Sequence, residues 1–455
     1  MPQIDPREAA TVLARGLGRR DFLRAAAAVG ASGAVAGALA ACSPGSASTP
    51  RPSTSPTQRG ILQPGSGDVS GDHYLGSTPD AVLWGYVPTV HSTPSARMRS
   101  GETITIDAVS HEGILEDQGR DPVSFFAEHG VASSDVLEDA IAIAADYDRT
   151  TRDFVKDGPH VVTGPVHVDG AEPGDVLKIE TLEAIPRVPY GVVSSRHGKG
   201  ALALTADGTP PAGITLEEVM PPVGTDGRAS GDPTSFGNLS TFTAVEGDEG
   251  VMTFGGGASA GSVRFPLRPF MGMMGVAFSQ DTDPTAPSAN SIPPTLGGGN
   301  IDIRQLGVGS TFYLPVQADG ALFYVGDPHM AMGDGEVALT AMEGSLRGTF
   351  RLTVCKPGSG DAPSVAYGYP FAETEDAWIP IGLSDPDGSV DGQGSDLDVA
   401  MRRAVVNALD FLEQDRGMDR ATAYAYLSAA ADFTVTQVVD RTVGVHGLIS
   451  KSHFG

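Results

Sequence analysis

The sequence predicts a mainly β protein of the α+β class, with sandwich-like or barrel-like sheets and a pair of C-terminal helices packed on them. Glycine and proline supply 59 and 34 of the 455 residues, and a chain with so many breakers favours short strands and turns. Several segments alternate polar and apolar residues, as half-buried strands do. Helical periodicity is clear near the C-terminal end of the chain.

Composition restricts the possible partners. The chain has 30 Lys and Arg against 56 Asp and Glu, which gives a formal net charge of −26. A strongly acidic surface repels phosphate backbones and anionic partners in general, so no nucleic-acid partner is expected. A chain of this length can bury a core without covalent staples, and two cysteines cannot form a disulfide framework.

Residues 1–42 have the features of an export signal. Arg19-Arg20 forms a twin-arginine run, and the Ala-rich and Gly-rich stretch from Ala25 to Ala41 lacks the bulk of a stable membrane span. The stretch ends in Leu39-Ala40-Ala41-Cys42, which resembles a lipobox, where the cysteine is acylated. We expect twin-arginine export and lipidation of Cys42, which would hold the protein on the outer face of a bacterial cytoplasmic membrane through its lipid anchor only.

The next segment, residues 43–72, is rich in Ser, Thr, Pro and Gly and is expected to be a flexible linker. A single catalytic domain is expected over residues 73–455. The signal carries five arginines and three acids, so the rest of the chain has a formal charge of −28.

Strands are expected where the alternation is strongest, at Thr103–Asp107, Val176–Glu180 and Thr349–Val354. Two apolar runs, Phe312–Val316 and Ala321–Val325, flank Ala318-Asp319-Gly320 in the manner of a β-hairpin.

The stretch 201–261 is Gly-rich and weakly patterned, and we expect an elaborated loop or insertion there.

Apolar residues at helical spacing from Leu397 to Leu412 predict a helix of at least four turns. Ser395 with Asp398 is expected to form its capping box, and Gly417 suits the position after its last turn. Asp419 is expected to cap a second helix that runs through Ala430, followed by a strand at residues 433–436.

Some motifs indicate other chemistries. Residues 257–261 fit the G-x-S-x-G pattern of serine hydrolases, but Val263–Pro266 afterwards looks extended, whereas that motif requires a helix. Ser194-Ser195 with Lys199 is a weak match to Ser-Ser-Lys amidases. Cys355 ends an apparent strand, where a thiol usually packs as a small apolar group.

An acidic stretch follows the last predicted sheet segments. Its spacing departs from the EF-hand pattern, so a solvated loop with a helix cap is favoured over a calcium site. Its acids are Asp385, Asp387, Asp391, Asp396 and Asp398.

The region from Gly297 to Glu343 is richest in potential ligands. Directly after the second apolar run come Asp327, His329, Asp334 and Glu336, with Glu343 further along, and Asp302 follows a glycine run. Nitrogen and oxygen ligands that converge on a cavity can hold a metal, and a free carboxylate can take a proton from water. By spacing alone, acidic turn residues with one surface histidine explain the pattern equally well.

Several longer segments, in order along the chain from about Ala81 to Phe454, resemble motifs of the acetamidase/formamidase family. The resemblance implies a β-rich oligomeric enzyme that hydrolyses short amides such as formamide or acetamide to a carboxylate and ammonia. The segments are Gly164–Asp175 (GPVHVDGAEPGD), Pro269–Ala277 (PFMGMMGVA), Gly298–Asp302 (GGNID), Gly320–Glu336 (GALFYVGDPHMAMGDGE) with Glu343, and the closing part from Leu397 to Gly447.

Two features depart from that family. Its members are usually soluble intracellular enzymes, whereas this chain carries an export signal. The stretch 201–261 is longer than the family core requires, and insertions near a site commonly change the substrate range.

The ligand types in these segments motivate a mechanism. A divalent metal, zinc first and calcium as the alternative, is expected to be held by His329, Asp302 and Asp334. Glu336, or Glu343 in its place, is expected to take a proton from water and pass it to the leaving amine. The oxyanion is expected to accept a hydrogen bond from Asn300. The candidate substrate-binding residues are Asp327, His111 and Glu112.

Two other functions stay open. One is a hydrolase of a different or larger amide of the cell envelope, and the other is a catalytically idle surface lipoprotein that binds a small ligand. The combination of Asn300, Asp302, His329 and Glu336 favours a catalyst, because a simple binding protein has no need of it.

Overall fold

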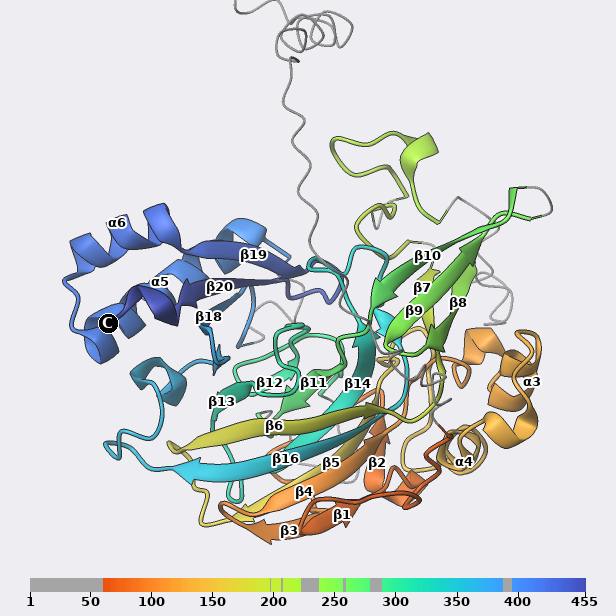
Figure 1. Ribbon diagram of the computed structural model, residues 1–455, viewed down its shortest axis with the longest axis horizontal. Coiled ribbons are helices and arrows are strands. Elements are labelled where there is room, and N and C mark those ends of the chain that lie inside the picture. The colour runs from red at the N-terminus through yellow and green to blue at the C-terminus, as the bar shows by residue number, and fades with distance from the viewer. Residues whose placement is uncertain are drawn as a thin grey trace, which may run out of the picture. The chain divides into compact units, whose positions relative to one another are not determined.

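The computed structural model describes residues 60–196, 198–205, 208–221, 237–256, 259–278, 289–387 and 395–455. The mainly β architecture is confirmed, with two large sheets and few helices (Figure 1). The signal with Cys42, residues 257–258 of the G-x-S-x-G pattern and Asp391 lie outside the described residues. Within the described part of the chain, no helix combines the length and apolarity that spanning a membrane requires.

The first sheet has nine strands and contains every strand that alternation predicted. All its neighbours are antiparallel except β1 and β4. In spatial order the strands are β1 (His73–Leu75), β4 (Thr103–Ala108), β16 (Leu346–Cys355), β6 (Val176–Pro186), β13 (Thr311–Pro315), β17 (Phe371–Glu373), β18 (Ala377–Leu383), β20 (Gly444–Ser450) and β19 (Asp432–Gln437).

The second sheet has eleven strands, and four of the predicted site residues lie on them: Asn300, Asp327, His329 and Glu343. Its main path is β10 (Gly261–Pro266), β9 (Glu249–Phe254), β8 (Asn238–Glu246), β7 (Tyr190–Arg196), β15 (Met342–Glu343), β14 (Phe323–Ala331), β11 (Phe270–Gly275) and β12 (Gly298–Asn300). Off this path, β5 (Val161–Asp169) pairs with β14, β2 (Val82–Trp84) and β3 (Ala96–Arg99).

The two sheets share one continuous apolar core, to which both contribute buried residues. Phe350 of β16 and Phe323 of β14 meet across it, with ring centroids 5.7 Å apart. Cys355 is buried, as expected of a packed thiol.

Helices α5 (Leu397–Arg416) and α6 (Arg420–Ala430) form the expected C-terminal pair, and α5 packs on β18 and β20 (Figure 1). Gly417 ends α5 with a φ of 67°, and Asp419 caps α6. The predicted capping box of Ser395 and Asp398 is wrong. Instead, the Asp396 carboxylate accepts hydrogen bonds from the backbone N–H groups of Asp398 and Val399.

Further helices precede this pair. They are α3 (Pro122–Ala127) and α4 (Glu138–Asp146), and the short 3₁₀ turns are Pro79–Ala81, Glu116–Gln118, Ser133–Asp135, Leu216–Glu218, Ser364–Tyr367 and Lys451–His453.

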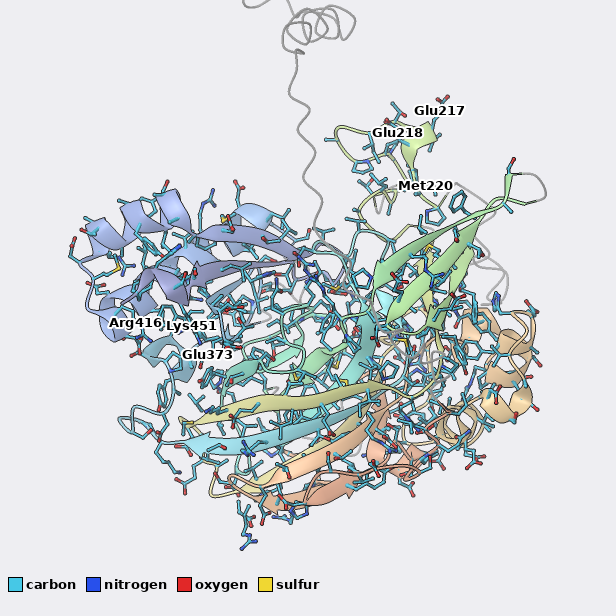
Figure 2. The ribbon with its side chains drawn as sticks, viewed as in Figure 1. Glu217, Glu218, Met220, Glu373, Arg416 and Lys451 are labelled. Atoms are coloured by element: carbon cyan, nitrogen blue, oxygen red, sulfur yellow. The ribbon has the colours of Figure 1, made fainter. Side chains whose placement is uncertain are left out.

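Side chains fasten the C-terminal end of the chain to the first sheet. Lys451 donates to the Glu373 carboxylate at 2.6 Å, and the Arg416 guanidinium lies 4.1 Å from the ring centroid of Trp378 (Figure 2). Lys451 near the chain end is therefore tied to β17, the neighbour of the strand β18 on which α5 packs.

The predicted hairpin between Phe312–Val316 and Ala321–Val325 is wrong. The first run is β13 of the first sheet, whereas the second enters β14 of the second sheet. Ala321 and Leu322 have φ values of 58° and 59°, a left-handed turn that takes the chain from one sheet to the other instead of folding it back.

The prediction of a loop at 201–261 is wrong for the C-terminal part of this stretch. Strands β8 and β9 pair with each other there and extend the second sheet. Strand β8 includes Ser240, Thr241 and Thr243, and these polar residues weaken the apolar pattern that identifies strands. The described part of 201–221 is loop around one short turn at Glu217 and Glu218 (Figure 2).

The end of the predicted linker also makes contacts with the body. Leu62 donates its N–H to the Arg187 carbonyl, Gln63 donates to Val136, and the Asp72 carboxylate accepts from Thr103. Ordered contacts therefore begin before residue 73, and the remaining domain boundaries stay predictions.

Candidate metal centre

Eight buried side chains of metal-ligand type converge beside β14. They form four overlapping groups of three, and within each group the potential ligand atoms lie within 4.8 Å of one another. The groups share members, so the cluster is continuous; we call it the acid–histidine cluster. Its members are His111, His160, Asp302, Asp327, His329, Glu336, Glu343 and Asp440.

The central residue is His329 on β14, which has no solvent exposure. Its Nε2 lies 3.0 Å from Asp327 Oδ2 and 3.1 Å from Glu343 Oε1. Its Nδ1 lies 3.9 Å from Asp302 Oδ1. The contact with Glu343 follows from strand register, because the two residues are direct partners in β14 and β15.

Three acids of the cluster have left-handed backbones. The φ values are 50° at Asp302, 50° at Asp327 and 45° at Glu336. Non-glycine residues rarely adopt this conformation, and such strain persists where the surrounding structure holds a functional group in place. The backbone therefore directs these carboxylates into the cluster at a local cost.

Gly272 on β11 makes room for the approach of Asp302 to His329. A Cβ atom at this position would lie 2.5 Å from Asp302 Oδ1 and 2.5 Å from His329 Cε1. This glycine belongs to the segment 269–277, and the close approach explains why a side chain is not accommodated there.

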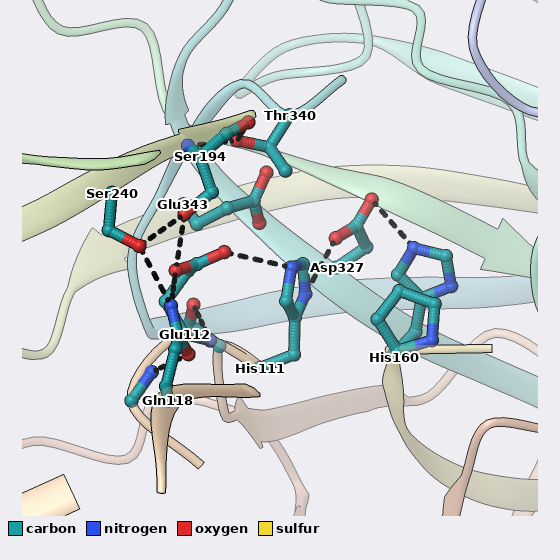
Figure 3. Close-up of polar contacts among 12 residues, drawn as sticks. His111, Glu112, Gln118, His160, Ser194, Ser240, Asp327, Thr340 and Glu343 are labelled. Atoms are coloured by element: carbon teal, nitrogen blue, oxygen red, sulfur yellow. Dashed lines mark hydrogen bonds and ion pairs between the residues drawn. The ribbon is translucent and has the colours of Figure 1, made fainter. Parts of the chain in front are cut away.

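His111 and His160 lie on either side of Asp327 (Figure 3). His111 Nδ1 lies 3.6 Å from Asp327 Oδ1, and His160 Nε2 lies 3.8 Å from Asp327 Oδ2. The Nδ1 atom of His160 is 2.9 Å from the Ser291 hydroxyl, which fixes the orientation of that ring.

A second layer holds His111 through Glu112, whose Oε1 lies 3.4 Å from His111 Nε2. The Glu112 carboxylate accepts from the Ser194 hydroxyl at 2.7 Å and from Gln118 (Figure 3). Arg196 Nη2 lies 3.7 Å from Glu112 Oε1. Burial alone would raise the pKa of Glu112, but His111 and Arg196 lower it to about 2. Because the Ser194 hydroxyl donates to the Glu112 carboxylate, Ser194 supports the cluster and does not serve as a nucleophile.

The concentration of acids shifts their proton affinities. Burial and the neighbouring Asp327 raise the pKa of Glu343 to about 7. The pKa of Glu336 is raised by burial and by Asp302, and that of Asp440 by burial and by Glu336. Like charges confined in a buried space repel, so a bound cation would relieve this arrangement.

The donor atoms fit a divalent metal. Among the described residues, both ring nitrogens of His111 and His329 and both oxygens of Asp302 are buried without a hydrogen-bond partner. So are Asp327 Oδ1, Glu343 Oε2 and Asp440 Oδ2. Buried polar atoms normally have partners, and neutral imidazole with carboxylate is a typical ligand set of zinc.

Most of the predicted site residues come together. The cluster contains Asp302, Asp327, His329, Glu336, Glu343 and His111, with Glu112 behind it. The structure does not bring Asp334 into it: its Oδ2 lies 2.6 Å from Arg304 instead.

Asn300 lies at the border of the cluster, where it lines the adjoining cavity. Its Nδ2 donates to the Ile292 carbonyl at 3.1 Å, while its Oδ1 has no partner among the described residues.

Sequence reasoning missed His160 and Asp440. His160 stands directly before β5 and four residues before Gly164, where the first family-like segment begins. Asp440 lies between β19 and β20. The sequence did contain a signal for His160, because a histidine at the start of a buried, apolar strand is uncommon. We find no comparable signal for Asp440.

A cavity of about 420 Å³ adjoins the cluster. Asp327, Glu336, Glu343 and Asp440 reach it, so the potential metal ligands are accessible to a small molecule.

The next element after Ser259 is strand β10 and not a helix, so the nucleophile elbow of a serine hydrolase is not formed there. The acid–histidine cluster is thus a better candidate for the catalytic site than the G-x-S-x-G motif.

Comparison with known proteins finds similarity to acetamidases and formamidases. Residues 282–448 match the model of the Acetamidase/Formamidase family. The chain is 28% identical over 223 residues to a putative formamidase of Schizosaccharomyces pombe, covering 44% of this chain and 53% of that protein. It is 26% identical over 222 residues to the acetamidase of Mycolicibacterium smegmatis, covering 39% of this chain and 49% of that protein. The chain thus spans about half the length of these curated relatives.

Another relative is the formamidase of Methylophilus methylotrophus, with 27% identity over 285 residues, 56% of this chain and 67% of that protein.

Solved structures share the fold. The acetamidase of Bacillus halodurans aligns with a TM-score of 0.56 at 23% identity, over 84% of this chain and 98% of that one. The acetamidase of Yersinia enterocolitica aligns with a TM-score of 0.58 at 21% identity, over 87% and 97%. These likenesses establish that the fold is the one found in acetamidase structures.

Proposed function

We propose that this chain is a member of the acetamidase/formamidase family and that it hydrolyses the carbon–nitrogen bond of a linear amide to a carboxylate and ammonia. The observation that carries the proposal is the acid–histidine cluster, six of whose eight members lie within the matched residues 282–448. The names of the curated relatives support amide hydrolysis.

The proposed cofactor is a divalent cation, with zinc first and calcium as the alternative. His329, Asp302 and Asp327 would hold it, since their ligand atoms form one of the converging groups. Asp327 thus takes the role that the sequence suggested for Asp334. When bound, such an ion polarises the amide carbonyl and lowers the pKa of water.

Glu336 is the proposed general base. Its side chain lines the cavity, and its Oε1 lies 3.8 Å from His329 Nε2. Glu343 is more enclosed, because it accepts from the Ala341 N–H at 3.2 Å and lies 3.1 Å from His329. The Glu336 carboxylate would take a proton from the attacking water and deliver it to the leaving nitrogen as the carbon–nitrogen bond breaks.

Asn300 is proposed to bind the amide nitrogen of the substrate. Its Nδ2 is engaged by the Ile292 carbonyl, which leaves Oδ1 as an acceptor beside the cavity. An acceptor there suits the N–H groups of a primary amide better than it suits an oxyanion.

Metal analysis and ammonia release test the proposal together. The zinc-loaded protein should release ammonia from acetamide or formamide, and His329→Ala should lose both activity and bound metal. A fully active, metal-replete His329→Ala variant contradicts the ligand assignment. Release of ammonia from no amide would instead favour a binding protein.

We also propose that the protein is exported, lipidated at Cys42 and assembled as a homo-oligomer. The twin-arginine run and the lipobox-like residues 39–42 support the first two steps. Cys42→Ser should move the protein from the membrane fraction to the soluble fraction, and sizing of the protein without its signal measures the assembly.

A further inference from the structure

The cavity beside the acid–histidine cluster is larger than a short amide requires. Its volume is about 420 Å³, and cavities of roughly 300–1,000 Å³ bind ligands of drug size. Away from the cluster, its wall includes five large apolar side chains: Leu115, Phe154, Ile292, Val438 and Val439. Such a wall stabilises methylene groups by removing them from water, and acetamide has a single methyl group to offer.

Basic residues also line the cavity, and two of them are already neutralised. Arg152 lies 3.1 Å from Glu116 and stacks over the ring of Trp84 at 4.5 Å. Arg196 lies 2.7 Å from Asp117. Both guanidinium groups therefore form ion pairs with acidic side chains of the protein itself.

Arg441 is different, because no described residue offers it a carboxylate, a hydrogen bond or an aromatic ring. It follows Asp440 directly, so this cation stands next to the acid–histidine cluster. Its φ of 65° is a left-handed conformation that a side chain of this size rarely adopts. A guanidinium in a cavity wall is well suited to bind a carboxylate through two parallel N–H bonds.

We propose that the preferred substrate is a linear primary amide whose acyl chain continues as several methylene groups and ends in a carboxylate that Arg441 binds. This inference rests on the proposed function, since it names the substrate class of the same site. The acidic net charge of the whole protein disfavours anionic ligands in general, and Arg441 is the local exception.

The reaction balances without a further reactant. The carbon–nitrogen bond breaks, the carbonyl carbon gains oxygen from water, and the nitrogen leaves as ammonia with the proton that water gave up. The product is a dicarboxylate, whose second carboxylate would lie near the acids of the cluster and be repelled by them.

The test compares three amides with the zinc-loaded protein: acetamide, hexanamide and adipic acid monoamide. The last two have the same chain length and differ in the terminal carboxylate. We expect kcat/KM to rise from acetamide to hexanamide and again to the monoamide. Arg441→Met should raise the KM for the monoamide roughly 10- to 100-fold, as expected for loss of a charge-assisted bond, and Arg441→Lys should restore part of it.

Arg97→Met is the matched control, because Arg97 is an exposed residue of β3 that does not line the cavity. The decisive quantity is the ratio of the KM values for hexanamide and the monoamide, which Arg441→Met should bring close to one. A wild-type protein that prefers acetamide, or a variant in which both KM values change equally, overturns the inference. Release of ammonia from none of the three amides overturns the proposed function as well, so the two failures are distinguishable.

Discussion

His329 on β14 and Glu343 on β15 are direct partners in the second sheet, and the Nε2 and Oε1 atoms of their side chains lie 3.1 Å apart. The sheet itself therefore fixes the distance between a candidate metal ligand and its acidic neighbour. A ladder of backbone hydrogen bonds is a more rigid support than a loop.

Neutralising Glu343 should weaken metal binding without lowering the stability of the metal-free protein. Glu343→Gln removes one negative charge from a crowded buried set, so the metal-free protein should melt at the same temperature as the wild type or higher. The same change should weaken zinc binding and reduce the rise in Tm on adding zinc, which for the wild type corresponds to about 2.7 kcal/mol at one hundred times Kd. Thermal melts with chelator and with zinc measure both effects, and a lower Tm in chelator contradicts the repulsion argument.

Glu336→Gln should reduce kcat by about 10²- to 10⁴-fold, the usual contribution of a general base. Zinc content should stay close to that of the wild type, because His329, Asp302 and Asp327 remain. Glu128→Gln, an exposed exchange just after α3, is the control. Loss of zinc in step with activity would place Glu336 among the ligands instead.

Gly272→Ala should damage the site more than the fold. The added methyl group would lie 2.5 Å from Asp302 Oδ1 and would push Asp302 away from His329. We expect at least a tenfold loss of zinc affinity, since a supporting position has been changed. Gly368→Ala is the matched control, because a Cβ there meets nothing within 4 Å and its φ of −130° suits any residue. Zinc titrations of both variants against the wild type decide the point.

His446 should make stability depend on pH below neutrality. Burial lowers its pKa to about 4, against an opposing effect of Asp334. The His446 imidazole therefore takes up a proton near pH 6.5 in the unfolded state but only near pH 4 in the folded state. The contribution of the neutral imidazole to the free energy of unfolding is complete above pH 6.5 and declines as the pH falls towards 4. The full difference is on the order of 3 kcal/mol.

Urea unfolding of the wild type and His446→Asn at several pH values between neutral and acidic tests this expectation. The difference in unfolding free energy between the two proteins should shrink as the pH falls. A difference that stays constant over the range refutes the assignment. His91→Asn, at an exposed histidine, serves as the control.

Local patterns predicted the elements whose side chains alternate or repeat cleanly, such as β4, β16, α5 and α6. The run from Asp327 to Glu343 could also be recognised, because its ligands follow one another in a single stretch. The choice between Asp327 and Asp334 could not be made from spacing. It depends on the left-handed backbone at Asp327 and on Arg304, which binds Asp334 from another segment.

The remaining members of the site depend on topology. His160 precedes β5, where its only signal is a histidine beside a buried strand, and Asp440 follows β19 without a comparable signal. The mistaken hairpin after β13 has a similar origin, because a turn with left-handed Ala321 and Leu322 sends the two strands into different sheets.

The acid–histidine cluster draws its members from almost the whole length of the described chain, from His111 before α3 to Asp440 between the last two strands. The proposed ligands Asp302, Asp327 and His329 lie within one short part of the chain, but the cluster around them is complete only when Asp440 and the last two strands are in place. Full metal affinity is then expected only late in folding, and the ion supply of the compartment in which folding ends would influence which metal the protein carries.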